Sequence, residues 1–212
     1  IIKQGNHTYG IINLPSFYVN FNNTRERNSA SDMALEIAKL KKQNVDGLIV
    51  DLRNNGGGSL SKVVEIAGLF IKEGPVVQVR DAERNIQVLS DTDSSTQWDK
   101  PLVILINELS ASASEILAAA MQDYGRAIII GSKQSYGKGT VQELIDLNRE
   151  IRNSSLGDLG AIKLTRQKFY RINGGSTQLK GVNSDVVIPD RYQYIKVGER
   201  EMENTMPWDE IP

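Results

Sequence analysis

Two short apolar segments, each followed by a loop and then by a helical pattern, constrain the fold of this 212-residue chain most strongly. They are residues 47–52, Gly-Leu-Ile-Val-Asp-Leu, and residues 101–107, Pro-Leu-Val-Ile-Leu-Ile-Asn. Nearly continuous apolar runs of this length are typical of buried parallel strands. A third strand is expected at 127–130. The strand–helix–strand alternation over residues 45–131 therefore predicts an α/β layer built on a mostly parallel sheet.

The remaining segments are predicted to flank this layer with helices and added β-strands. Apolar residues at helical spacing predict helices at 29–43, 61–71 and 114–124, the first of them capped by Ser29 or Ser31. Hairpins are expected within residues 1–19, around a turn at 5–7, and between 75–80 and 85–89. Later strands are expected at 142–147, 160–165 and 169–171, and residues 20–28 read as a loop. We expect one domain at 1–198 and a charged C-terminal tail at 199–212.

Composition excludes several classes of protein. Hydrophobic residues make up 40% of the chain, enough for a sizeable core, and the net charge of -1 gives no electrostatic case for binding nucleic acid or anionic membranes. No apolar run approaches the roughly 18 residues of a membrane helix. The chain begins at Ile1 with neither an initiator Met nor a signal peptide, so we interpret it as a fragment of a longer or processed protein.

The scarcity of histidine and cysteine limits the chemistry. The chain has one histidine, His7, and no cysteine, so Ser–His–Asp and Cys–His centres are nearly excluded. The carboxylates form no ligand cluster, and we expect neither a metal nor a cofactor. If the protein is a hydrolase, a serine paired with a lysine is what remains.

Three serines stand at a predicted strand-to-helix junction, where functional groups gather in sheets of this kind. Ser110, Ser112 and Ser114 can simply be turn and cap residues, because serine is a preferred N-cap. Alternatively, one of them is a nucleophile near the partial positive end of the helix. Ser114 suits the cap, since Glu115 and the apolar run follow it. Ser112 is then the better nucleophile.

Lys138 is the best candidate for the base, because it lies between two glycines and beside Tyr136 and Val141. Burial would lower its pKa from the ordinary value near 10.4 and leave a neutral amine. The alternative is a solvated turn lysine, as we expect of Lys133. Gln142 can reach back to orient the amine or can be an exposed strand residue. The segment 131–139 is no phosphate-binding P-loop, because five residues separate its glycines and Gly139 follows the lysine.

The glycine-rich loop at 54–58 follows the first apolar strand. Its three consecutive glycines expose backbone N–H groups that can form an oxyanion hole, cradle a phosphate or make a tight turn. The cost of three glycines in chain entropy favours a functional role. Asp51 and Arg53 are expected to pair or cap. Asp123, near the end of the serine helix, supports the site or is a helix-end charge.

These segments together resemble the carboxyl-terminal processing, or tail-specific, proteases of the S41 serine peptidase family. The resemblance rests on residues 50–58 (Val-Asp-Leu-Arg-Asn-Asn-Gly-Gly-Gly), 110–116 (Ser-Ala-Ser-Ala-Ser-Glu-Ile) and 136–142 (Tyr-Gly-Lys-Gly-Thr-Val-Gln). It is closest to the bacterial periplasmic Prc subgroup and extends over residues 68–81, 121–126, 167–178 and 207–209. It covers nearly the whole chain and implies a ClpP/crotonase-like core.

The resemblance implies a role for each matching residue. The family serine falls on Ser112, its lysine on Lys138 and its assisting glutamine on Gln142. The oxyanion donors fall on the amide of Ala113 and on a glycine of the first loop, Gly57 or else Gly58. Asp123 matches a supporting aspartate of the Prc subgroup. The implied activity is endopeptidase cleavage of proteins near accessible C-termini in the periplasm or cell envelope of a bacterium, without a cofactor.

Two departures from the family pattern qualify this expectation. Lys138 lies 26 positions after Ser112, one more than the family pattern, with the extra residue within 132–135. No PDZ carboxylate-binding loop is present, so substrate recruitment would need a PDZ domain or an adaptor outside this chain. The rival interpretations are a silent or latent S41 fold used for binding, and a crotonase-like acyl-CoA enzyme. The sequence does not specify an oligomeric state.

Overall fold

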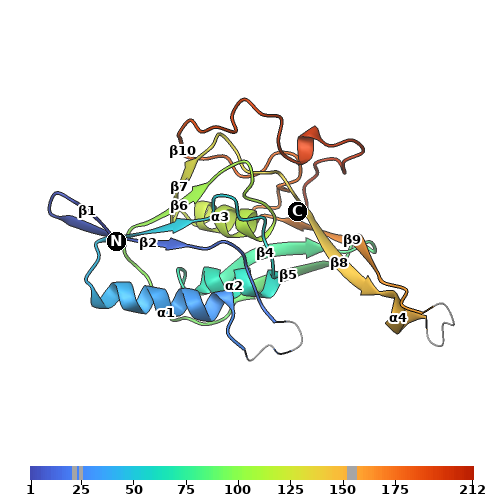
Figure 1. Ribbon diagram of the computed structural model, residues 1–212, viewed down its shortest axis with the longest axis horizontal. Helices are drawn as coiled ribbons and strands as arrows, with labels where there is room; N and C mark the ends of the chain where they lie inside the picture. The colour runs from blue at the N-terminus through green and yellow to red at the C-terminus, as the bar shows by residue number, and fades with distance from the viewer. Residues whose placement is uncertain (21–22, 24–25, 152–156) are drawn as a thin grey trace.

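The computed structural model describes residues 1–20, 23, 26–151 and 157–212, and it has two β-sheets with a layer of helices packed against them (Figure 1). The first sheet has the order β1 (Ile2–Gln4), β2 (His7–Asn13), β3 (Gly47–Asp51), β6 (Leu102–Ile106), β7 (Ile128–Gly131), β10 (Val186–Val187). Its strands are parallel except for β1, which pairs with β2 in a hairpin. The predicted α/β fold on a mostly parallel sheet is confirmed.

The second sheet is antiparallel and has the order β5 (Ile86–Asp91), β4 (Gly74–Arg80), β9 (Ala161–Tyr170), β8 (Thr140–Asp146). The sequence pattern predicted two strands where β9 is one. The reason is that β9 changes partner along its length: residues 161–168 pair with β8, and residues 168–170 pair with β4. The β8–β9 hairpin projects from the body of the molecule toward the short helix α4 (Leu147–Glu150) (Figure 1).

Three helices fill the space beside the first sheet: α1 (Ser29–Lys42), α2 (Leu60–Gly68) and α3 (Ala113–Asp123). Helix α3 contacts β7 of the first sheet and β4 of the second, so it links the two layers. The cap of α1 is Asn28 rather than Ser29 or Ser31, because the Asn28 side chain accepts hydrogen bonds from the N–H groups of Ala30 and Ser31. None of the helices in the described part of the chain is long and apolar enough to cross a bilayer.

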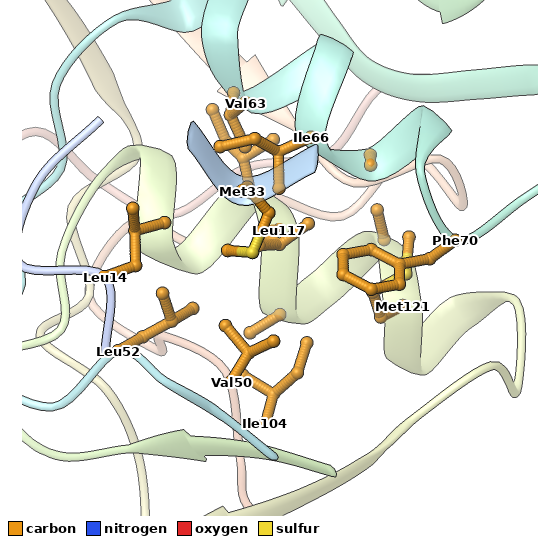
Figure 2. Close-up of a cluster of buried hydrophobic side chains, with 14 of the residues drawn as sticks. Leu14, Met33, Val50, Leu52, Val63, Ile66, Phe70, Ile104, Leu117 and Met121 are labelled. Atoms are coloured by element: carbon orange, nitrogen blue, oxygen red, sulfur yellow. The ribbon is translucent and has the colours of Figure 1, made fainter. Parts of the chain in front are cut away.

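The core lies between the first sheet and these helices (Figure 2). Val50 of β3 pairs in register with Ile104 of β6, and both are fully buried beneath Leu117 and Met121 of α3. The opposite faces of the same strands are only half-buried, as at Ile49 and Val103. These strands are therefore fully buried on one face only, because the helices cover one side of the sheet.

This layering brings the two chemically interesting loops together. Strands β3 and β6 are neighbours and run parallel, so they deliver residues 52–58 and 107–112 to the same edge of the sheet. The carboxyl ends of parallel strands are where α/β folds place their sites.

The C-terminal segment docks on the body, and several of its contacts are made by its last six residues. Trp208 Nε1 donates to the Ser176 carbonyl at 2.8 Å, and the Ile211 N–H donates to the Gly174 carbonyl at 2.9 Å. Asp209 accepts hydrogen bonds from Arg80 Nη2 at 2.6 Å and from the buried Lys168 ammonium. The short 3₁₀ helix η1 (Glu199–Glu201) begins this segment.

We expect Asp209→Ala to lower the free energy of unfolding by about 2 kcal/mol, because it leaves the buried Lys168 ammonium without its carboxylate. Denaturant titration measures this change. Asp93→Ala, which removes an exposed carboxylate whose hydrogen bonds are both from nearby Ser95, is the matched control and should change stability by less than about 0.5 kcal/mol. Equal effects of the two substitutions would show that Asp209 does not anchor the tail.

Candidate active site

Ser112 is distinguished from its neighbouring serines by where its side chain lies. Ser110 Oγ donates to the Leu52 carbonyl and Ser114 Oγ donates to the Asn55 carbonyl, both at 2.8 Å, and both serines are fully buried. Ser112 is half-buried and lines a pocket. Ser114 was expected to cap the helix, but it lies within the first turn, and Ser112 occupies the N-cap position.

The backbone at Ser112 is strained. Its φ of 57° and ψ of -113° lie outside the regions that L-residues ordinarily adopt. Such a conformation costs on the order of 1–3 kcal/mol and persists only where surrounding contacts enforce it. Here the Ser112 N–H donates to Glu115 Oε2 at 2.9 Å, and the neighbouring Ala111 N–H donates to the Asn55 carbonyl at 3.0 Å.

Asn55, which is fully buried, fastens the glycine loop to the serine loop. Its carbonyl accepts from both the Ala111 N–H and the Ser114 hydroxyl, and its side-chain Nδ2 donates to the Leu14 carbonyl at 2.7 Å. Its Oδ1 accepts from the Gly57 N–H at 2.8 Å. One asparagine therefore fixes the distance between the two loops.

The two glycines proposed as oxyanion donors differ in their surroundings. A Cβ at Gly57, whose φ is 106°, would lie 2.8 Å from Ser112 Cβ and 2.9 Å from the Ala111 carbonyl oxygen, so no larger residue fits. The N–H of Gly57, however, is already bonded to Asn55 Oδ1. Gly58 and Ala113 line the pocket beside Ser112, and Gly57 does not. This geometry favours Gly58 over Gly57, the reverse of the order expected from the sequence.

Every backbone N–H and carbonyl group of residues 137–139 makes a hydrogen bond. The N–H groups of Gly137 and Lys138 donate to the Glu115 carboxylate, and the N–H of Gly139 donates to Gln178 Oε1 at 2.8 Å. The carbonyls of residues 137, 138 and 139 accept from the Leu179 N–H, the Thr177 hydroxyl and the Phe169 N–H. The segment Gly137–Gly139 is therefore a rigid support for the lysine, despite its two glycines.

Glu115 joins the loop that contains Ser112 to the segment Gly137–Gly139. Its carboxylate is fully buried and accepts four hydrogen bonds, from the Ser135 hydroxyl at 2.6 Å and from three backbone N–H groups at residues 112, 137 and 138. Burial raises the pKa of Glu115 to about 7, while the four donors favour the ionised form and act in the opposite direction. The sequence pattern had assigned Glu115 only to the start of a helix.

The Lys138 side chain is half-buried, and its Nζ donates to Gln142 Oε1 at 3.0 Å. Burial lowers the pKa of Lys138 below its usual range, and the positive charge of Lys163 lowers it further, against the opposing effects of Glu199 and Glu115. Lys133, the alternative lysine, is exposed.

Two pockets meet at Lys138. The first, which we call the serine pocket, has a volume of about 250 Å³ and is lined by Gly56, Gly58, Leu60, Ser112, Ala113, Ile116, Lys138, Val141, Gln142, Lys163 and Phe169. The second, the tail pocket, has a volume of about 440 Å³ and is bounded on one side by Glu199 and residues 202–206. A larger cavity of about 630 Å³, near Asp51 and Asp190, contains neither Ser112 nor Lys138.

Asp123 lies away from this centre. It is the last residue of α3, about 16 Å along the helix from Ser112. Its carboxylate accepts from Arg171 Nε at 3.1 Å and Nη2 at 2.5 Å, which ties the end of α3 to the residue after β9. Among residues 1–20, 23, 26–151 and 157–212, no three His, Asp or Glu side chains are grouped as metal ligands would be.

We expect Glu115→Ala to lower the free energy of unfolding by at least about 3 kcal/mol, because it leaves several buried N–H groups without an acceptor. Denaturant titration measures the loss. Glu36→Ala, which breaks only the surface pair with Lys39, is the control and should cost less than about 0.5 kcal/mol. A small loss at Glu115 would mean that its four hydrogen bonds do not hold the two loops together.

Known proteins resemble this chain over most of its length. The chain is 47% identical over 210 residues to a tail-specific protease of Haemophilus influenzae, covering 99% of this chain and 29% of that protein. It is 37% identical over 172 residues to a carboxy-terminal-processing protease of Bartonella bacilliformis, covering 78% of this chain and 37% of that protein. This chain thus spans well under half the length of these two relatives.

A solved structure and a family model agree with these relatives. The structure of a photosystem II D1 C-terminal processing protease superposes with a TM-score of 0.69 at 30% identity, covering 85% of this chain and 42% of that one. The model of peptidase family S41 matches residues 8–188. The chain therefore belongs to peptidase family S41.

Proposed function

We propose that this chain carries the catalytic centre of a serine endopeptidase that cleaves proteins near their C-termini, with Ser112 as nucleophile and Lys138 as general base. The observation that carries the proposal is that Ser112 and Lys138 line one pocket while a single buried carboxylate, that of Glu115, holds the backbone of both. Membership of peptidase family S41 supports the reaction class. The names of the two bacterial relatives support cleavage near a C-terminus.

The proposed reaction begins with the neutral amine of Lys138, which takes the proton from Ser112 Oγ as Oγ bonds to the carbon of a peptide carbonyl. Negative charge develops on the carbonyl oxygen, and the N–H groups of Ala113 and Gly58 stabilise it. The peptide C–N bond then breaks, and the Lys138 ammonium returns its proton to the leaving amine. Water, deprotonated by Lys138, hydrolyses the acyl-enzyme and restores Ser112.

Gln142 and Glu115 form no bond with the substrate in this reaction, and they hold the reacting pair in place. Gln142 Oε1 accepts from Lys138 Nζ and so limits the directions in which the amine can point.

Asp123 is assigned a supporting structural role through Arg171. We assign the peptidase core to residues 1–198 and the docked tail to residues 199–212.

The serine pocket is lined by both polar and apolar residues, among the latter Leu60, Ile116, Val141 and Phe169. We propose that a small or medium residue of the substrate fills this space beside the cleaved bond. Recruitment of the protein substrate is assigned to a PDZ domain or an adaptor outside these 212 residues, and the site of action to the envelope of a bacterium.

Replacing either member of the pair tests the proposal. We expect Ser112→Ala and Lys138→Ala each to lower kcat/KM for a peptide with an apolar C-terminal tail by at least about 10³-fold, because the two residues act as one unit. Lys133→Ala, at an exposed lysine of the adjoining loop, should leave the rate within about twofold. Unchanged cleavage by Ser112→Ala or by Lys138→Ala would rule out this catalytic centre. If the wild-type protein cleaves no peptide and a serine-reactive phosphonate does not label Ser112, the result would favour a catalytically silent fold.

The pH dependence gives a second test. Since Lys138 must be neutral to act as a base and its pKa is lowered by burial, kcat/KM should rise with pH along a limb whose midpoint lies below 10.5. A pH–rate profile, recorded over the pH range in which the protein stays folded, measures the midpoint. A profile in which kcat/KM shows no rising limb at any pH below 10.5 would contradict the role of Lys138.

A further inference from the structure

Lys138 lies between two charged side chains of opposite sign that come from different parts of the chain. Lys163 of β9 lines the serine pocket, and Glu199 of η1 lines the tail pocket. Lys138 lines both pockets, so the reacting amine is flanked by a positive charge in one pocket and a negative charge in the other.

The position of Lys163 is set by the register of the projecting hairpin. Lys163 pairs with Leu144, and Thr165 pairs with Gln142, so residues 163 and 165 lie on the same face as Gln142. Apart from Lys138, it is the sole charged side chain lining the serine pocket. Among the described residues it takes part in none of the ion pairs. Its charge therefore acts on the pocket without a carboxylate beside it.

Glu199 is positioned by the same residue that supports the lysine loop. Gln178 Nε2 donates to Glu199 Oε1 at 3.3 Å and to the Met206 carbonyl at 3.1 Å, while Gln178 Oε1 accepts from the Gly139 N–H. The Glu199 N–H also donates to the Tyr136 carbonyl at 2.9 Å. The start of the tail is thus bonded directly to the Tyr136 carbonyl on one side of Lys138 and, through Gln178, to the N–H of Gly139 on the other.

We propose that Lys163 and Glu199 are positioning residues with opposite effects on the protonation equilibrium of Lys138 during the reaction. Lys163 favours the neutral amine, and Glu199 favours the ammonium. This inference rests on the proposed function, because it assigns roles only if Lys138 is the base. The reaction needs both forms of the lysine: the neutral amine accepts the serine proton, and the ammonium donates to the leaving group. Two opposed charges keep both forms accessible.

Three other titratable groups lie near Lys138: Glu115, Glu203 and Tyr136. Glu115 contacts the Lys138 backbone N–H and, like Glu199, raises the pKa of the amine, but it is committed to four hydrogen bonds. Glu203 lines the tail pocket from an exposed position, and Tyr136 lies there with its pKa raised by burial. Burial of the amine is the larger cause of the lowered pKa of Lys138, and Lys163 is the one neighbour whose charge lowers it further.

The test is the pH profile of charge-neutralising variants. We expect Lys163→Gln to move the midpoint of the rising limb of kcat/KM to higher pH and Glu199→Gln to move it to lower pH, each by about half a pH unit. The double variant should return close to the wild-type midpoint. Both shifts should shrink in about 1 M salt, where charges are screened beyond roughly 3 Å.

Matched controls and a second readout separate this inference from the proposed function. Lys133→Gln and Glu201→Gln remove exposed charges nearby and should leave the midpoint unchanged. The pH dependence of the rate at which a serine-reactive phosphonate labels Ser112 should show the same opposed shifts of its midpoint. This readout does not require a peptide substrate. Shifts that are absent or in the same direction overturn the roles of Lys163 and Glu199. If Ser112→Ala and Lys138→Ala still abolish cleavage in that case, the proposed function stands.

Discussion

The arrangement of the site depends on one buried carboxylate. Glu115 accepts hydrogen bonds from the backbone of Ser112 at the start of α3 and from the backbone of Lys138 on a loop 23 residues later. Without this acceptor, the strained backbone at Ser112 and the glycine-flanked lysine would have no common support. The free-energy cost of burying the carboxylate is offset by its four donors, and the result is a fixed relation between the proposed nucleophile and base.

Buried polar side chains also connect the loops around Ser112 and Lys138 to their neighbours. Asn55 fixes the glycine loop to the serine loop, and Gln178 fixes the lysine loop to the C-terminal tail. Each is a fully buried amide that uses both its oxygen and its nitrogen. The parallel strands β3 and β6 supply the edge on which these connections are made, and the layer of helices holds that edge in place.

The sequence predicted the fold class, most strand and helix positions and the family, because apolar runs, helical spacing and the glycine and serine motifs are local signals. It also selected Ser112, Lys138 and Gln142, which the structure brings to one pocket. It did not reveal the hydrogen-bonding role of Glu115 or Gln178, whose partners lie 22 and 39 positions away. The preference for Gly58 over Gly57 also required the structure, since it depends on which N–H the Asn55 side chain already binds.

The most direct test of the central claim is a crystal structure of the protein after reaction with a peptide inhibitor that forms a covalent bond to an active-site serine. Our account predicts a bond to Ser112 Oγ, with Lys138 Nζ within hydrogen-bond reach of it. The inhibitor oxygen should lie within about 2.7–3.1 Å of the N–H groups of Gly58 and Ala113. A bond to another residue, or an adduct at Ser112 whose oxygen points away from both N–H groups, would contradict it.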